Sequence, residues 1–269
     1  MAEHPSETAT VVVMANDRPG LRVCEYLAAR GDRIARLYLH EPEGQKLGDA
    51  IRRASKCRPD QVFTASALSD PAHVQGLRDL APDYIITVYW AHLLKPEVFR
   101  SARRSTVNFH PAMLPINRGW FPHVHSILDG SPTGVTLHAI DDDADTGPIW
   151  AQRPVAMTAY DTAFTIYQRL QTEIVHLFRE TWPEIVAGRI APRPQSKEGG
   201  CYHKKSEIGR LDEIDPNATM KVSDLLKILK ARSFGDLGFA YVEENGERVY
   251  LNLRVGRSTN FSVNNSELF

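Results

Sequence analysis

The sequence predicts an α/β protein with a doubly wound, mostly parallel sheet and a small C-terminal α+β module. Three observations carry this prediction. Short apolar runs alternate with amphipathic stretches over the first 110 residues, which is typical of βαβ units. A long amphipathic stretch follows further along the chain. After it the composition becomes polar and rich in proline and glycine, and then an Asn-Gly hairpin signal appears.

The expected strands are short runs rich in apolar and β-branched residues. The first is almost continuously apolar, as in a strand buried on both faces. The expected strands are 10–15, 33–39, 61–64, 84–90, 134–140 and 148–155, with a further strand in 105–115 that runs into a loop.

Amphipathic stretches between the strands predict helices. One expected helix follows the turn at 16–20, a second includes Ile51, a third covers 73–80, and a long fourth begins at about Thr162. In the last of these, apolar residues recur at intervals of three and four, so they share one helix face that we assign to the core. These residues are Phe164, Tyr167, Leu170, Ile174 and Leu177. Pro183 and Gly188 are predicted to close this helix.

The chain divides into a larger domain, 1–200, and a smaller module, 201–269. Residues 189–216 are expected to form a linker or functional loop. In the module we expect a helix at 223–232, capped by Ser223, with an apolar face of Leu225, Leu226 and Leu229. A hairpin is expected at 239–255 around Asn245-Gly246. The polar tail from Arg257 is expected to be mobile.

Composition excludes several classes of protein. The 269 residues carry a net charge of −1, which argues against a basic nucleic-acid arm and an acidic tail. The N-terminus lacks the apolar core of a secretory signal, and no run approaches the roughly 18 apolar residues of a membrane helix. Three cysteines, Cys24, Cys57 and Cys201, match neither a disulfide framework nor a zinc site. We therefore expect a reduced, cytoplasmic protein without membrane segments.

The densest polar motif is Asn108-Phe-His110-Pro111. Asn108 and His110 are two apart at a strand end, so their side chains point the same way. Pro111 favours extended backbone at His110. An amide donor and an imidazole aimed at one point suit oxyanion stabilisation and proton transfer. The alternative is an ordinary hydrogen-bonded pair at a strand end.

A second motif, 140–147, holds four carboxylates in five positions, which repel unless solvated or bound. Asp141, Asp143 and Asp145 match the first, third and fifth ligands of a calcium loop. The sixth position is Thr146 rather than glycine and the twelfth is Gln152 rather than glutamate, so this interpretation fails. A solvated charged loop remains the alternative.

The histidines do not predict a metal site. His123 and His125 are two apart in an expected helix and so do not face each other. His138 lies in an expected strand, and Cys201-Tyr-His203 has no second ligand pair nearby. The first turn lacks Gly-x-Gly-x-x-Gly, and Gly-x-Ser-x-Gly is absent, which disfavours an NAD-binding reductase and a serine hydrolase.

The two polar motifs together resemble the 10-formyltetrahydrofolate-dependent formyltransferase family, which includes glycinamide ribonucleotide and methionyl-tRNA enzymes. The matching elements occur in the family's order: Asn108-Phe-His110-Pro111-x-x-Leu114-Pro115, Gly119, Gly134-Val-Thr, and Asp141-x-x-x-Asp145-Thr-Gly147. The resemblance covers 80–160 well and the preceding Rossmann-like half loosely. Residues 116–124, and the helix and hairpin of the small module, are similar to the branch that formylates nucleotide-linked amino sugars.

The resemblance implies a role for each matching residue. His110 would be the acid/base group, Asn108 would donate to the formyl oxygen, and Asp145 would orient His110 or a water and collect the proton. The reduced folate, 10-formyltetrahydrofolate, would be the formyl donor, with no metal. Its pocket would be formed by Tyr89, Trp90, His92, Leu94, His138, Ile140, Asp141 and Asp142.

The acceptor would be held by residues that follow the catalytic motif. Arg118 would bind a diphosphate as a charge-assisted donor, with a surface arginine as the alternative. Trp120 would pack on the acceptor, with a core position as the alternative. The predicted set also contains Asn117, Lys204 and Lys205. The two lysines would reach phosphates of the acceptor, and the equally good alternative is a solvated charge pair.

Other activities within this family would require sequence features that this chain lacks. Formylation of initiator methionyl-tRNA needs a basic surface, but residues 214–269 contain seven Lys/Arg and seven Asp/Glu. Purine enzymes of the family have a glycine-rich loop after the first strand, whereas this chain has the turn 16–20, whose role stays open. A folate or nucleotide-sugar binding protein without catalysis is a hypothesis of another class, disfavoured by the intact Asn108, His110 and Asp145.

We therefore expect a sugar N-formyltransferase that acts on a nucleotide-linked amino-deoxy sugar, with dTDP-4-amino-4,6-dideoxyglucose as the best single acceptor. The resemblance implies a product for O-antigen or lipopolysaccharide biosynthesis. No nucleic-acid or membrane partner is expected. The edge of the predicted hairpin is a possible homodimer contact.

Overall fold

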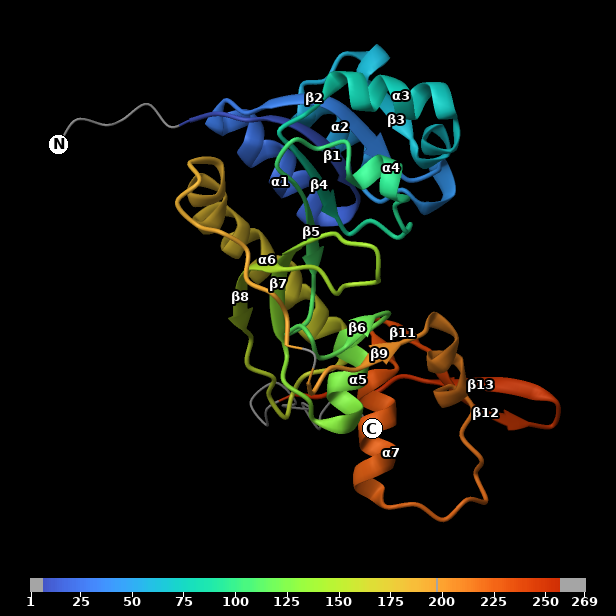
Figure 1. The fold of residues 1–269 in the computed structure, drawn as a ribbon. Coiled ribbons are helices and arrows are strands. Elements are labelled where there is room, and N and C mark those ends of the chain that lie inside the picture. The colour runs from blue at the N-terminus through green and yellow to red at the C-terminus, as the bar shows by residue number, and fades with distance from the viewer. Residues whose placement is uncertain (1–6, 197, 257–269) are drawn as a thin grey trace, which may run out of the picture.

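A computed structural model describes residues 7–196 and 198–256 (Figure 1). Its centre is a seven-stranded sheet with the order β3-β2-β1-β4-β5-β7-β8. The strands β1 to β5 are parallel to one another. Strand β7 runs antiparallel to its neighbour β5, and β8 runs antiparallel to β7. The strands are β1 (Thr10–Ala15), β2 (Arg33–Leu39), β3 (Val62–Thr64), β4 (Tyr84–Val88), β5 (Ser105–His110), β7 (Gly134–Ala139) and β8 (Ile149–Pro154). The predicted Rossmann-like, doubly wound and mostly parallel fold is confirmed.

Helices cover both faces of the sheet. They are α1 (Asp17–Arg30), α2 (Gly48–Ser55), α3 (Pro71–Leu80), α4 (Pro96–Phe99), α5 (Pro122–Asp129), α6 (Ala163–Val186) and α7 (Val222–Ala231). Short 3₁₀ helices are formed by Pro42–Gly44, Pro59–Gln61, Ala65–Ser69 and Lys205–Leu211. In the described residues, no helix combines the length and the apolar character needed to cross a membrane.

The two core layers follow from the alternation of side chains along the strands. In β1, Val11 and Val13 are fully buried in the layer that contains α1 and α6. Val12 and Met14 point the other way, into the layer that contains Val74 of α3. This double burial explains why β1 is almost continuously apolar.

The long helix α6 runs past its predicted stop. Pro183 lies inside α6, which ends only at Val186. A proline lacks the N–H that would bond the carbonyl four residues earlier, here that of Arg179. The Tyr26 hydroxyl of α1 donates to this carbonyl at 3.0 Å, so the helix continues without an orphaned acceptor. The prediction that Pro183 helps to close the helix is wrong for this reason.

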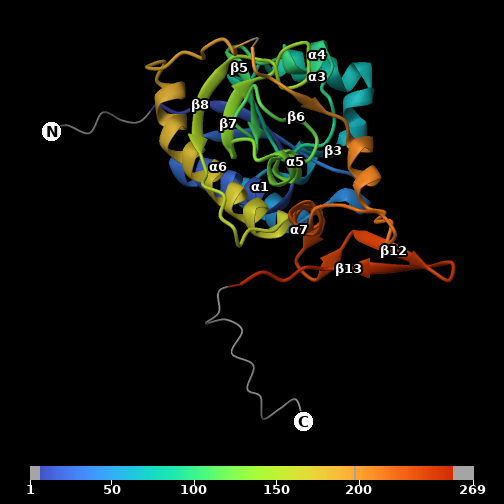
Figure 2. The ribbon, with the colours of Figure 1, turned by 90° about the horizontal axis from the view of Figure 1, so that it is seen from below.

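The predicted module contains α7 and a hairpin of β12 (Ala240–Glu244) and β13 (Glu247–Leu251), with a smaller pair, β10 (Ser233–Phe234) and β11 (Leu237–Gly238). Asn245 and Gly246 have φ of 53° and 82°, as the predicted hairpin turn requires. The hairpin projects away from the sheet, and α7 packs against α5 (Figures 1 and 2). The predicted Ser223 cap is wrong, because α7 begins at Val222 and Lys221 occupies the cap position without a side-chain bond.

The segment after residue 200 returns to the larger domain. Strand β9 (Tyr202–His203) pairs with β6 (Arg118–Gly119), next to the motif that contains His110. The division at residue 200 stays a prediction, but residues just beyond it lie against the catalytic motif. The tail from Arg257 is outside the described residues.

Candidate active site

A cleft of about 600 Å³ opens beyond the carboxyl ends of β4 and β5. It lies beside the point where the sheet order reverses, between β1 and β4, and open α/β sheets bind ligands beyond the carboxyl ends of their strands near this point. Asn108 and His110 at the end of β5, His138 of β7 and Asp145 of the following loop all line it. The two sequence motifs are therefore parts of one site.

The amide of Asn108 is held in one orientation. Its Oδ1 accepts a hydrogen bond from the Thr87 hydroxyl of β4 at 2.6 Å. Its Nδ2 therefore faces the cleft, where it contacts His138 Nε2 at 3.0 Å and donates to Asp145 Oδ1 at 3.4 Å. His138 Nδ1 donates to the Ala139 carbonyl at 2.8 Å, so its Nε2 is the acceptor. The bond to Asp145 is long, so Nδ2 could give it up to donate to an oxygen atom of a bound substrate.

The ring of His110 is buried and also fixed in orientation. Its Nε2 donates to the backbone carbonyl of Asn117 at 3.0 Å. Nδ1 is then the basic nitrogen, and it lies 3.5 Å from Asp145 Oδ2. His110 is thus arranged to take up a proton on Nδ1 beside a carboxylate.

Asp145 is held in an unusual backbone conformation, with φ of 56°. Its Oδ2 accepts the Gly119 N–H at 2.9 Å, and its carbonyl accepts Gln195 Nε2 at 3.0 Å. These bonds come from two different loops. They aim the carboxylate between His110 and His138.

The pKa values follow from this geometry. Burial lowers the pKa of His110, and Asp145 only partly offsets it, so the ring is neutral at neutral pH. Burial disfavours the charge of Asp145, but His110, His138 and the Gly119 N–H outweigh it and hold the pKa of this carboxyl well below its usual range. The resting site is a neutral base beside a carboxylate anion.

The pH dependence of turnover tests this assignment. His110 must be unprotonated to accept a proton, and its pKa lies below the ordinary 6.5, so we expect the acid limb that His110 causes to lie below pH 6.5. The acceptor amine must also be unprotonated to attack, and its own titration is measured separately. Because Asp145 raises the pKa of His110, Asp145→Asn should move the His110 limb to still lower pH. An acid profile that is the same in the wild type and in Asp145→Asn would contradict the assignment.

The acidic loop between β7 and β8 avoids charge repulsion through separate partners. Asp141 Oδ1 accepts the Thr146 hydroxyl at 2.6 Å, and Asp142 pairs with Arg100 at 2.6 Å. Asp145 alone points toward His110. The loop closes at Gly147, where an added Cβ would lie 1.9 Å from the Ala139 carbonyl oxygen. A glycine is therefore required where the loop returns to the sheet.

Gly147→Ala should displace the loop and with it Asp145. We expect a loss of about 1–3 kcal/mol in stability from overpacking, together with a lower kcat. Thermal unfolding and steady-state kinetics measure both effects. Gly209→Ala is the matched control, since a Cβ there meets nothing within 4 Å. Wild-type kinetics in Gly147→Ala would show that the loop does not set the position of Asp145.

The turn after β1, whose role the sequence left open, is linked by hydrogen bonds to the segment after β4 that lines the cleft. Asn16 Oδ1 accepts the Lys46 N–H at 2.7 Å, and Asn16 Nδ2 contacts His40 Nδ1 at 2.8 Å. His40 Nε2 in turn accepts the Ala91 N–H at 3.2 Å. The turn thus fixes the backbone that follows β4.

All eight residues predicted to form the folate pocket line this cleft: Tyr89, Trp90, His92, Leu94, His138, Ile140, Asp141 and Asp142. Three residues that line the cleft carry buried polar atoms without a protein partner, namely Tyr89 OH, Trp90 Nε1 and His123 Nδ1. Such orphaned atoms are rare in native proteins and mark places where a ligand can supply the missing bond. The apolar walls and these atoms fit a flat, hydrogen-bonding ring such as a pteridine.

The predicted acceptor residues divide into two groups. Trp120 lines the cleft, and Lys205 Nζ lies 4.9 Å from the centre of its ring. Arg118 and Lys204 are not among the lining residues. Asn117 is completely buried, and its amide nitrogen bonds to Ser126 and Ser131. The Asn117 side chain is therefore not exposed to the cleft, and its backbone carbonyl contacts His110 Nε2, while its role in binding the acceptor stays a prediction.

Several residues that line the cleft were not predicted. Phe121, Pro122 and His123 come from the start of α5, and Tyr167 comes from α6. Tyr167 belongs to the apolar stripe that we assigned to the core. Tyr167 is the one residue of that stripe with a polar group, and this hydroxyl is the sequence feature that distinguishes it from the core residues.

The fold and this site are those of a group-transfer protein: an amide suited to stabilise an oxyanion and an imidazole suited to accept a proton lie together at the carboxyl ends of the strands of a doubly wound sheet. A family model described as "Formyl transferase" matches residues 3–181, and a model described as "N-formyltransferase dimerization C-terminal domain" matches residues 207–257. The chain belongs to the formyl transferase family.

Individual relatives carry more specific names. The dTDP-4-amino-4,6-dideoxyglucose formyltransferases of Mycobacterium tuberculosis and Mycobacterium bovis are 37% identical to this chain over 146 residues, which is 54% of this chain. The match covers 62% of the length of these relatives.

Solved structures share the fold over most of the chain. A sugar N-formyltransferase from Shewanella sp. superposes with a TM-score of 0.79 at 21% identity and covers 92% of this chain and 98% of that one, a likeness of fold. The formyltransferase PseJ from Anoxybacillus kamchatkensis is 29% identical, with a TM-score of 0.54 and coverage of 75% and 88%. Its structure contains UDP-4,6-dideoxy-4-formamido-L-AltNAc and tetrahydrofolate.

Proposed function

We propose that this protein is a sugar N-formyltransferase, which moves the formyl group of 10-formyltetrahydrofolate to the amine of a nucleotide-linked amino-deoxy sugar. The observation that carries the proposal is the convergence of Asn108 Nδ2, His110 Nδ1 and the Asp145 carboxylate on one cleft. The names of the relatives support the choice of donor and acceptor class.

The chemistry assigns a step to each side chain. The reduced folate supplies the formyl group. When the acceptor amine attacks the formyl carbon, charge develops on the formyl oxygen, and the Asn108 amide donates to it. His110 would accept on Nδ1 the proton that the amine loses, and Asp145 would stabilise the resulting imidazolium. The bond between the formyl carbon and N10 of the folate would then break, and the imidazolium would return its proton to N10, so that tetrahydrofolate leaves and His110 is neutral again. Atoms that bind the folate would include the orphaned Trp90 Nε1 and Tyr89 OH.

The acceptor sugar would lie against lining residues that the folate prediction does not include. Trp120 and Phe121 offer apolar surface there. Burial, with smaller effects from His125 and Arg232, lowers the pKa of His123 to about 3, so this histidine is neutral at neutral pH. Apolar rings and a neutral imidazole suit a deoxy sugar. The best single acceptor is dTDP-4-amino-4,6-dideoxyglucose, the sugar in the names of the curated relatives.

The experiment is a formyl-transfer assay over a panel of acceptors. Purified protein is mixed with 10-formyltetrahydrofolate and with dTDP-, UDP- or GDP-amino sugars, and products are weighed by mass spectrometry. One nucleotide sugar that gains a single formyl group supports the proposal. Formylation of initiator methionyl-tRNA instead would contradict it in favour of that branch. Folate binding without any product would identify a binding protein without catalysis.

A homodimer and a cytoplasmic location are part of the proposal. The matched dimerization domain covers the hairpin and β11, and this part of the chain exposes the large side chains Leu237, Phe239, Val249 and Tyr250. A second copy of this chain is the occupant that such a surface favours. The three cysteines are free, as expected in a reducing compartment.

Light scattering tests the dimer. We expect twice the chain mass of 30.2 kDa for the wild type and a shift toward the monomer in Tyr250→Lys, which places a charge in the buried contact. Glu247→Lys, at an exposed polar position of the same hairpin, is the control. A monomeric wild type at micromolar concentration would contradict this part of the proposal.

A further inference from the structure

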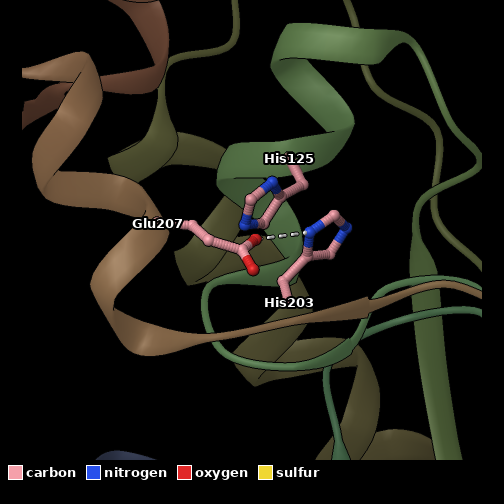
Figure 3. Close-up of side chains that lie close together, drawn as sticks. All are labelled: His125, His203 and Glu207. Carbon is pink, nitrogen blue, oxygen red and sulfur yellow. Dashed lines mark hydrogen bonds and ion pairs between the residues drawn. The ribbon is translucent and has the colours of Figure 1, made fainter.

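A second cluster of side chains joins α5 to the segment after residue 200. His125 of α5, His203 of β9 and Glu207 of the following 3₁₀ helix face one another (Figure 3). One candidate ligand atom from each lies within 4.8 Å of the other two. The two imidazole rings are stacked, with centroids 3.4 Å apart and planes 9° from parallel. His203 Nδ1 lies 3.2 Å from Glu207 Oε2.

The protons of His203 can be placed through Asn117. Asn117 Nδ2 donates to Ser126, Ser131 and, at 3.4 Å, to the Pro122 carbonyl, which can only accept. Its Oδ1 therefore faces the other way and accepts from His203 Nε2 at 3.1 Å. Nδ1 of His203 is then the nitrogen that faces Glu207 Oε2, so one imidazole nitrogen and one carboxylate oxygen are directed at the same point.

His125 supplies an independent sign of a missing ligand. The side chain is 9% exposed, and its Nε2 is buried without any protein partner. An imidazole nitrogen without a hydrogen-bond partner is available as a metal ligand.

We propose that His125, His203 and Glu207 form a binding site for a divalent transition-metal ion, with Zn²⁺ as the best fit. Two imidazoles and one carboxylate with water in the fourth position are a known zinc ligand set. The bond from His203 Nε2 to Asn117 is the outer contact that zinc-bound histidines usually make through their second nitrogen. Coordination requires one of the stacked rings to tilt, and His125 Nε2 has no hydrogen bond to lose.

The position of this site gives it a consequence for the cleft. A bound ion would fasten the segment 202–207 to α5, and this segment supports Asn117, whose carbonyl orients His110. The site is separate from the proposed transfer chemistry, so it can be tested without an activity assay.

The test measures metal binding by the full-length protein. After treatment with a chelator, the protein is dialysed against Zn²⁺ and its metal content is determined, and Co²⁺ is added to a second sample to record its visible absorption. We expect one Zn²⁺ per chain, a tetrahedral Co²⁺ spectrum and a higher Tm with Zn²⁺. His125→Ala and His203→Ala should each weaken binding at least as much as the roughly 10–100-fold that loss of an outer contact costs.

His176→Ala is the matched control, because His176 is an exposed histidine beside Glu173 on α6. Glu207→Gln removes the carboxylate charge at a partly exposed position and keeps the size of the side chain, so it guards against a folding defect in the histidine variants. If the wild type binds no Zn²⁺ or Co²⁺, the cluster holds a proton only and the proposal is wrong. Unchanged binding in all three cluster variants would place the metal elsewhere and overturn it equally.

Discussion

His110→Ala lowers kcat by about 10²–10⁴, because the acceptor amine then loses the group that takes its proton. The folded state should persist, since the variant removes one ring and its single bond from Nε2 to the Asn117 carbonyl. Steady-state kinetics with the amino-sugar acceptor measure the effect on kcat, and circular dichroism and thermal unfolding check the fold.

The control for His110→Ala is His176→Ala, which removes an exposed histidine remote from the cleft and should leave kcat unchanged. A near-normal kcat in His110→Ala would remove the proposed mechanism. An equal loss in both variants would point to a defect in the preparation rather than to proton transfer.

Asn108→Ala should cost about 10²–10³ in kcat, the usual effect of losing one preorganised donor to an oxyanion. The KM for the folate should change much less, because the amide acts on charge that develops in the transition state. Kinetics with separate variation of the two substrates measure this difference.

Thr87→Val provides a second test of the same amide. It keeps the volume of the side chain but removes the hydroxyl that holds Asn108 Oδ1. Its effect on kcat should have the same direction as that of Asn108→Ala and be smaller, because the donor remains but is less well oriented. A KM effect without a kcat effect in Asn108→Ala would assign this residue to binding instead.

Much of the fold and the chemistry could be predicted from local sequence. The alternation of apolar runs and amphipathic stretches determines the sheet and its helices, and Asn245-Gly246 determines the hairpin turn. Asn108 and His110 lie at one strand end, so their common direction follows from the pleat. The spacing of the acidic loop differs from that of a calcium loop at the sixth and twelfth positions, which is visible in the sequence alone.

The parts that the sequence did not predict depend on long-range contacts. Asn117 follows the catalytic motif directly and looked like an acceptor contact, but Ser126, Ser131 and His203 enclose its amide. His125 and His203 are far apart in the chain and meet only because β9 pairs with β6. Pro183 is tolerated inside α6 because Tyr26, from another helix, bonds the freed carbonyl.

The central claim is the transfer of a formyl group at the cleft formed by Asn108, His110 and Asp145. The most direct measurement supplies 10-formyltetrahydrofolate labelled with ¹³C in the formyl group, together with dTDP-4-amino-4,6-dideoxyglucose. We predict that the label appears on the sugar nitrogen, one per folate consumed, with wild-type protein and not with His110→Ala. Label released as formate, or found on the sugar equally with both proteins, would contradict the account.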